Sequence, residues 1–89
     1  MAKIELFPDL SHCIETAARK EYEDMVRRLF AGADDAELEE RLGLLRDFLE
    51  TADFRELRGQ SEEYLLRGKK IKFVLYREQD QLRYKLVEC

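Results

Sequence analysis

Residues 69–89 alternate between apolar and polar side chains in two runs, which predicts a β-hairpin with one buried face. Pairing the runs about Gln79 and Asp80 places nearly all of the apolar residues on that face. The facing pairs are then Arg77 with Leu82, Leu75 with Tyr84, Phe73 with Leu86, and Ile71 with Glu88. A three-residue loop would mix the two faces, so the hydrophobic pattern excludes it. Because Gln79-Asp80 suits a two-residue type I′ turn poorly, we expect a four-residue loop, Glu78 to Gln81, which keeps the same register.

A second alternating run lies near the N-terminus. Residues 3–7 alternate in the same way and end at Pro8, which cannot continue a central strand. This run predicts a short strand that turns Ile4 and Leu6 toward the inner face of a sheet. The hairpin can therefore gain a third strand from the start of the chain.

Helical spacing begins directly after this run. Apolar residues recur at intervals of three and four from Leu10 to Leu29, and Gly32 follows as a stop signal. This pattern predicts an amphipathic helix over about residues 9–31. Asp9 or Ser11 is its expected N-cap, because short polar side chains accept hydrogen bonds from the first free amides of a helix.

The next helical stretch is predicted to begin at Asp34, with Glu37 three residues later in a capping-box arrangement, and to end near Thr51. Its apolar stripe consists of Leu38, Leu42, Leu45 and Leu49. Leu44 and Phe48 widen this stripe, so the helix is expected to touch more than one neighbour. These two surplus apolar positions are also candidates for contact with a partner or with a second copy of the chain.

A third helix repeats the start signal with Asp53 and Glu56 and is predicted to end at Gly68. Three helices followed by an antiparallel hairpin form an α+β fold. We expect the helices to pack on the apolar face of the hairpin, because an isolated hairpin is only marginally stable in water.

Length and composition favour a single small domain over residues 1–89. The chain is 45% hydrophobic and 40% charged, with one proline and four glycines, which is typical of a folded domain. We find no apolar run long enough for a membrane span and no signal peptide, so we expect a cytoplasmic protein without a membrane partner. Its net charge is −4, but residues 1–66 carry −8 and residues 67–89 carry +4.

This excess of positive charge gathers on the outer side of the predicted hairpin, which is the strongest candidate for a binding surface. The candidate residues are Lys70, Lys72, Tyr76, Arg83 and Lys85. Cations with an aromatic ring between them suit phosphates and a stacked base, or an acidic protein surface. The same pattern is typical of a solvated outer face, since lysines on edge strands also prevent edge-to-edge aggregation. The acidic balance of the whole chain disfavours a nucleic-acid ligand.

Residues able to carry catalysis or bind a metal are sparse. His12 and Cys13 are adjacent, so on a helix their side chains point about 100° apart and do not converge on one ion. Together with Glu21 they give the one alternative in which the chain is an enzyme or a metalloprotein. No phosphate-binding loop, nucleophile elbow or zinc-ligand spacing is present. We therefore expect no catalytic residue, no metal and no cofactor.

The leading hypothesis is a non-enzymatic interaction or accessory module that binds an unidentified protein or associates with itself. It would offer either the outer face of the hairpin or the widened stripe at Leu44 and Phe48. The alternative is a nucleic-acid-binding domain that uses the basic outer face, with binding that weakens steeply as salt is added.

Overall fold

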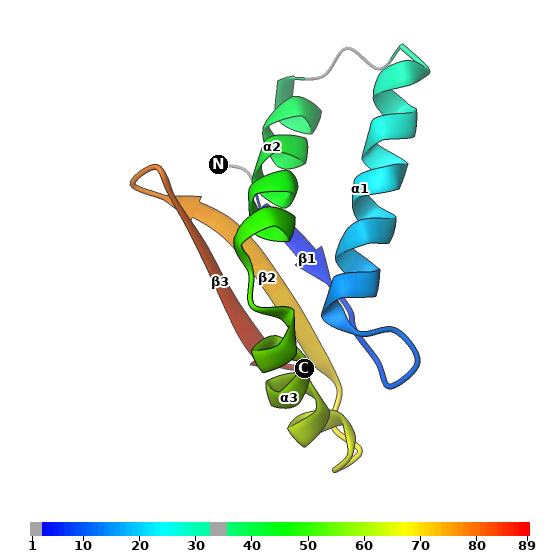
Figure 1. The fold of residues 1–89 in the computed structure, drawn as a ribbon, viewed down its shortest axis with the longest axis vertical. Coiled ribbons are helices and arrows are strands. Elements are labelled where there is room, and N and C mark those ends of the chain that lie inside the picture. The colour runs from blue at the N-terminus through cyan, green and yellow to red at the C-terminus, as the bar shows by residue number, and fades with distance from the viewer. Residues whose placement is uncertain (1–2, 33–35) are drawn as a thin grey trace.

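The computed structural model describes residues 3–32 and 36–89, which form an α+β fold and confirm the predicted class (Figure 1). The elements are β1 (Lys3–Leu6), α1 (Ile14–Phe30), α2 (Ala36–Thr51), α3 (Phe54–Leu65), β2 (Ile71–Glu78) and β3 (Gln81–Glu88). The strands form one antiparallel sheet in the order β1-β2-β3. None of the helices in the described part of the chain is long and apolar enough to cross a membrane.

The register of the hairpin is as predicted, but its loop is shorter. Arg77 pairs with Leu82, Leu75 with Tyr84, Phe73 with Leu86, and Ile71 with Glu88. Glu78 also pairs with Gln81, so a two-residue turn joins the strands and the expected four-residue loop is wrong. Gln79 and Asp80 have φ values of 52° and 61°, the left-handed pair that a type I′ turn requires. Pairing along both eight-residue strands therefore outweighs the poor turn sequence.

The predicted N-terminal strand is present and completes the sheet. Ile4 pairs with Leu75 and Leu6 with Phe73, so β1 lies beside β2 on the side opposite to β3. Ile4 and Leu6 are buried, as their alternation with polar residues predicts. The central strand of the sheet is thus β2, and both other strands are edges.

The first helix begins five residues later than expected. Asp9 does not cap it, because its Oδ1 accepts hydrogen bonds from the amides of Ser11 and His12, at 2.8 and 2.7 Å, within a turn. The N-cap is Cys13, whose backbone is extended and whose side chain makes no capping hydrogen bond. The predicted stop is correct, since Gly32 follows the helix with a φ of +92°.

The ends of α2 and α3 can be compared with the start and stop positions predicted from the sequence. The predicted start of the second helix at Asp34 lies outside the described residues, and its end at Thr51 is as expected. The cap of the third helix is confirmed: the Asp53 carboxylate accepts a hydrogen bond from the amide of Glu56 at 3.2 Å. Gly68, with a φ of +77°, follows the last turn before the chain enters β2.

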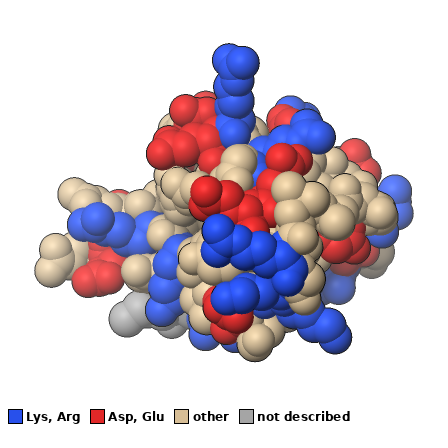
Figure 2. All heavy atoms as spheres, turned by 90° about the horizontal axis from the view of Figure 1, so that it is seen from below, with Lys and Arg blue, Asp and Glu red and all other residues tan. Residues whose placement is uncertain are grey.

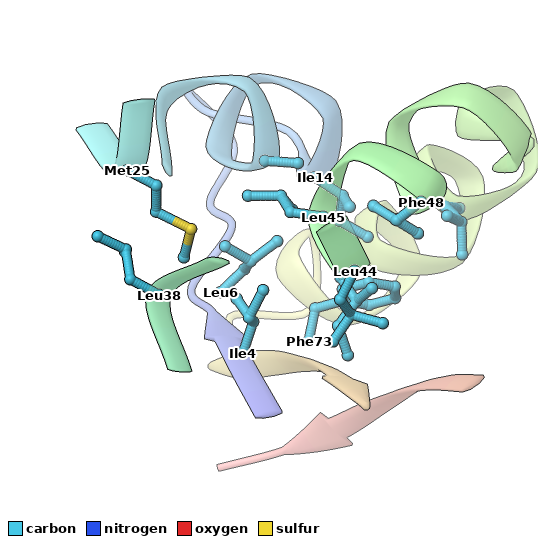
Figure 3. Packing of buried hydrophobic residues seen from close by; sticks show 12 residues of the cluster. Ile4, Leu6, Ile14, Met25, Leu38, Leu44, Leu45, Phe48 and Phe73 are labelled. Atoms are coloured by element: carbon cyan, nitrogen blue, oxygen red, sulfur yellow. The ribbon is translucent and has the colours of Figure 1, made fainter. Parts of the chain in front are cut away.

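The core lies between the helices and one face of the sheet, which we call the inner face (Figure 3). Helix α2 is central, because it contacts α1 and all three strands, as its widened stripe predicts. Ile14 and Met25 on α1, Leu45 on α2 and Ile4 and Leu6 on β1 meet in this layer. The opposite face of the sheet, which we call the outer face, is not covered by these helices.

Candidate functional site

The outer face gathers side chains from all three strands. Its members are Lys3 and Glu5 from β1, Lys72, Val74, Tyr76 and Glu78 from β2, and Gln81, Arg83, Lys85 and Val87 from β3. Four cations therefore share this face with two carboxylates, Glu5 near its centre and Glu78 at the turn. Val74 sits between Glu5 and Lys85 in the register and is only 3% exposed, so the aliphatic stems of its neighbours cover it. The face is a charged surface over a small apolar centre.

Glu5 is the residue that sequence reasoning missed on this face. Its carboxylate lies 3.4 Å from the ammonium of Lys72 and 3.4 Å from that of Lys3. The hydrogen bond from Lys3, and then the charge and hydrogen bond of Lys72, lower the pKa of Glu5 below its usual range. The alternation of residues 3–7 already predicts that the Glu5 side chain points to the face of the strand away from Ile4 and Leu6. The outer face therefore includes an acidic residue that the hairpin alone does not supply.

Tyr76 and the two cations of β3 form the centre of the remaining positive charge. The ammonium of Lys85 lies 5.9 Å from the centroid of the Tyr76 ring, within the range of a cation–π contact. The guanidinium of Arg83, which faces Tyr76 in the register, donates a hydrogen bond to Gln81 Oε1 at 3.1 Å. Within the described residues, neither Arg83 nor Lys85 forms an ion pair. These two cations are therefore available to an acidic partner.

A second basic group lies at the end of the molecule where α3 finishes and β2 begins. It comprises Arg67, Lys69, Lys70 and Lys72. Figure 2 shows this end from below, with lysine and arginine side chains gathered near its middle and acidic side chains among them. Lys69 lies 3.5 Å from Glu88, whereas Lys70 is exposed and its carbonyl accepts a hydrogen bond from the amide of Cys89. Lys70 thus continues the hairpin ladder next to the outer face.

The structure corrects the interpretation of Leu44 and Phe48 as positions for a partner. Both side chains are completely buried. The Phe48 ring contacts the rings of Phe54, Phe73 and Tyr84, at centroid distances of 5.4, 5.3 and 5.6 Å. The widened stripe of α2 exists because this helix packs against both α1 and the sheet, so it leaves no apolar surface at these two positions.

The candidate chemistry at His12 and Cys13 does not assemble into a metal site. The Cys13 thiol lies 3.3 Å from Thr16 Oγ1, and hydrogen bonds from Thr16, with a smaller contribution from the charge of Arg58, lower its pKa. His12 Nδ1 instead lies 3.4 Å from Asp9. No group of three or more histidine, cysteine or acidic residues within residues 3–32 and 36–89 is placed to hold a metal ion.

Comparison with known proteins places this small α+β domain in a protein family. One protein-family model matches residues 3–86, from the first residue of β1 into β3, and the chain belongs to that family. The chain is 46% identical over 67 residues to a protein of Archaeoglobus fulgidus described as "Uncharacterized protein". The match covers 67% of this chain and 79% of that relative. No solved structure matches.

Proposed function

We propose that this protein is a non-enzymatic interaction module whose outer face binds an acidic surface on a partner protein. The observation that carries the proposal is the exposed positive charge of Lys70, Arg83 and Lys85, for which no ion pair is found in the described part of the chain. Arg83 and Lys85 are successive outer-face residues of β3, whereas Lys70 precedes β2 and pairs with Cys89 at the end of the hairpin away from the turn. Complementary charge across an interface accelerates encounter and selects the partner.

The same surface suits nucleic acid less well. Glu5 places a carboxylate among the cations, where it would repel a phosphate backbone. The Tyr76 ring already holds the Lys85 ammonium, so a base would compete with it for the ring. The net charge of −4 also opposes the approach of a polyanion at long range. An acidic protein surface can instead place its carboxylates locally against Arg83 and Lys85.

Self-association through this face is disfavoured by its charge. Two outer faces brought together would oppose cations to cations, and like charges directly opposite are destabilising. The carboxylates of Glu5 and Asp9 have lowered pKa values. For Glu5 the main cause is the hydrogen bond from Lys3, and for Asp9 it is the backbone amide of His12. Neither carboxylate therefore suits the role of a general acid, which requires a raised pKa.

Charge reversal tests this proposal. A face variant combines Lys70→Glu, Arg83→Glu and Lys85→Glu. A matched control reverses three exposed helical cations for which no ion pair is found in the described residues: Lys20, Arg27 and Arg55. Immobilised poly-glutamate should retain the wild-type protein and the control at low salt and release the face variant. Equal retention of the two variants would refute the proposal, and stronger binding to single-stranded RNA than to poly-glutamate would favour the nucleic-acid alternative.

A further inference from the structure

Strand β3 has one open edge. It is eight residues long and pairs with β2 on one side, and no described element lies along its other side (Figure 1). An unpaired edge of this length presents a row of free amides and carbonyls, which can template pairing with another extended chain. The opposite edge, β1, has four residues and offers a shorter row.

The two-residue turn determines which backbone groups point outward. It makes Glu78 and Gln81 a hydrogen-bonded pair, and in an antiparallel ladder such pairs alternate with pairs that are not bonded to each other. Odd-numbered residues of β3 therefore bond to β2. The bond from the amide of Cys89 to the carbonyl of Lys70, at 2.8 Å, agrees with this alternation. The amides and carbonyls of Leu82, Tyr84 and Leu86 are then directed to the open edge.

The side chains of these three residues form an apolar strip on the inner side of the edge. Leu82 and Leu86 are half-buried against the core, and Tyr84 is 44% exposed. The Tyr84 ring contacts the rings of Phe48 and Phe73 at 5.6 and 5.5 Å, so it is firmly placed. An added strand would turn every second side chain toward this strip and would extend the apolar inner face.

The other side chains of an added strand would lie beside Arg83 and Lys85 on the outer face. A second copy of β3 meets these cations unfavourably, because antiparallel pairing centred on Tyr84 sets Arg83 of one chain opposite Lys85 of the other, twice. Acidic side chains at the same positions would be attracted. The charge of the edge therefore selects an acidic segment over a second copy.

We propose that β3 binds an extended segment of a partner protein in which apolar and acidic residues alternate, so that the segment becomes a fourth strand. This inference rests on the proposed function and adds the mode of binding and the chemistry of the partner. Main-chain hydrogen bonds to Leu82, Tyr84 and Leu86 supply affinity, and the alternation of side chains supplies specificity.

The probe is an eight-residue peptide of alternating valine and glutamate. In antiparallel pairing with its valines facing the apolar strip, the valine amides pair with the open edge and the glutamate amides point away. N-methylation of the valine amides should therefore weaken binding at least about tenfold, since each methyl group removes a main-chain hydrogen bond to the edge. N-methylation of the glutamate amides is the matched control and should leave the affinity nearly unchanged. Binding should also slow hydrogen exchange at the amides of Leu82, Tyr84 and Leu86.

Charge specificity is tested by reversing the charges on β3 and on the peptide. The doubly reversed variant, Arg83→Glu with Lys85→Glu, should lose the valine–glutamate peptide and gain a valine–lysine peptide. Equal effects of the two N-methylations, or no peptide binding while poly-glutamate is still retained, would overturn strand addition and leave the proposed function standing. If the wild-type protein binds neither the peptide nor poly-glutamate, both strand addition and the proposed function are refuted. Protection of the three amides that rises with protein concentration in the absence of peptide would show that a second copy occupies the edge.

Discussion

The carboxylate of Glu5 on β1 and the ammonium of Lys72 on β2 lie 3.4 Å apart across the outer face. This contact ties the N-terminal strand to the centre of the sheet on the side without helices. Lys3 approaches the same carboxylate, also at 3.4 Å, so Glu5 bridges two cations. The bridge neutralises part of the outer face and leaves its positive charge concentrated on β3.

Acid should weaken the fold partly through Glu5. Because its pKa is lowered in the folded state, mainly by the hydrogen bond from Lys3, Glu5 stabilises the fold above the pKa it has when unfolded. That stabilisation is lost as the pH falls through the folded pKa. Glu5→Gln should therefore lower stability at pH 7 and flatten the fall in stability below about pH 5, the ordinary glutamate range. Urea unfolding at a series of pH values measures both effects.

The matched control for this prediction is Glu23→Gln. Glu23 is exposed on α1, and no ion pair is found for it within the described residues. This variant should retain the wild-type dependence of stability on pH. If Glu5→Gln keeps the full acid-induced loss, the bridge between β1 and β2 contributes nothing to folding.

The type I′ turn should be improved by glycine. Asp80 has a φ of 61°, and a residue with a side chain is strained in the left-handed region by about 1 kcal/mol. Asp80→Gly should therefore raise the free energy of unfolding by up to about 1 kcal/mol, with an unchanged register. Chemical denaturation measures the gain. Gln81→Gly, within β3, is the control and should be destabilising, and a loss in both variants would contradict the turn geometry.

Most of the sheet was predictable from the alternation of apolar and polar side chains along its strands. The register of the hairpin and the inward orientation of Ile4 were predictable because one misplaced residue would expose an entire apolar face. Local polar contacts were less predictable. Asp9 had two ways to satisfy backbone amides, and the structure has the turn rather than the helix cap. The role of Glu5 depended on strand order, which a single sequence does not give.

The candidate site was predictable only for the residues of the hairpin. Tyr76, Arg83 and Lys85 share a face because of strand periodicity alone. Leu44 and Phe48 were misassigned because a wide apolar stripe indicates several neighbours without telling whether they belong to the same chain. Here the second neighbour is the sheet itself.

The cap of α3 should contribute measurably to stability. Asp53 accepts the amide hydrogen of Glu56 at 3.2 Å, and replacing such a cap by alanine costs about 1 kcal/mol. Asp53→Ala should therefore lower the free energy of unfolding by about that amount. Asp53→Asn keeps an acceptor oxygen and should restore most of the loss. Urea denaturation compares the three proteins, and equal destabilisation by alanine and asparagine would rule out a capping role.

Phe48 should be essential for folding and not for association. Its ring is fully buried among Phe54, Phe73 and Tyr84, so Phe48→Ala removes contacts to one other helix and two strands at once. Truncation of a buried phenylalanine costs about 3–5 kcal/mol, a large part of the stability of a domain of this size. Calorimetry should show a strongly lowered Tm, or no folded protein.

The control for this prediction is Phe30→Ala at the end of α1. Phe30 is 88% exposed, so its removal should change stability by less than about 0.5 kcal/mol. Light scattering on both variants separates packing from association. A Phe48→Ala protein that stays folded with an unchanged Tm but changes its oligomeric state would place the ring at an interface. If Phe48→Ala prevents folding, and the molecular mass of the wild-type protein does not change on dilution, the place of Phe48 in the core is confirmed.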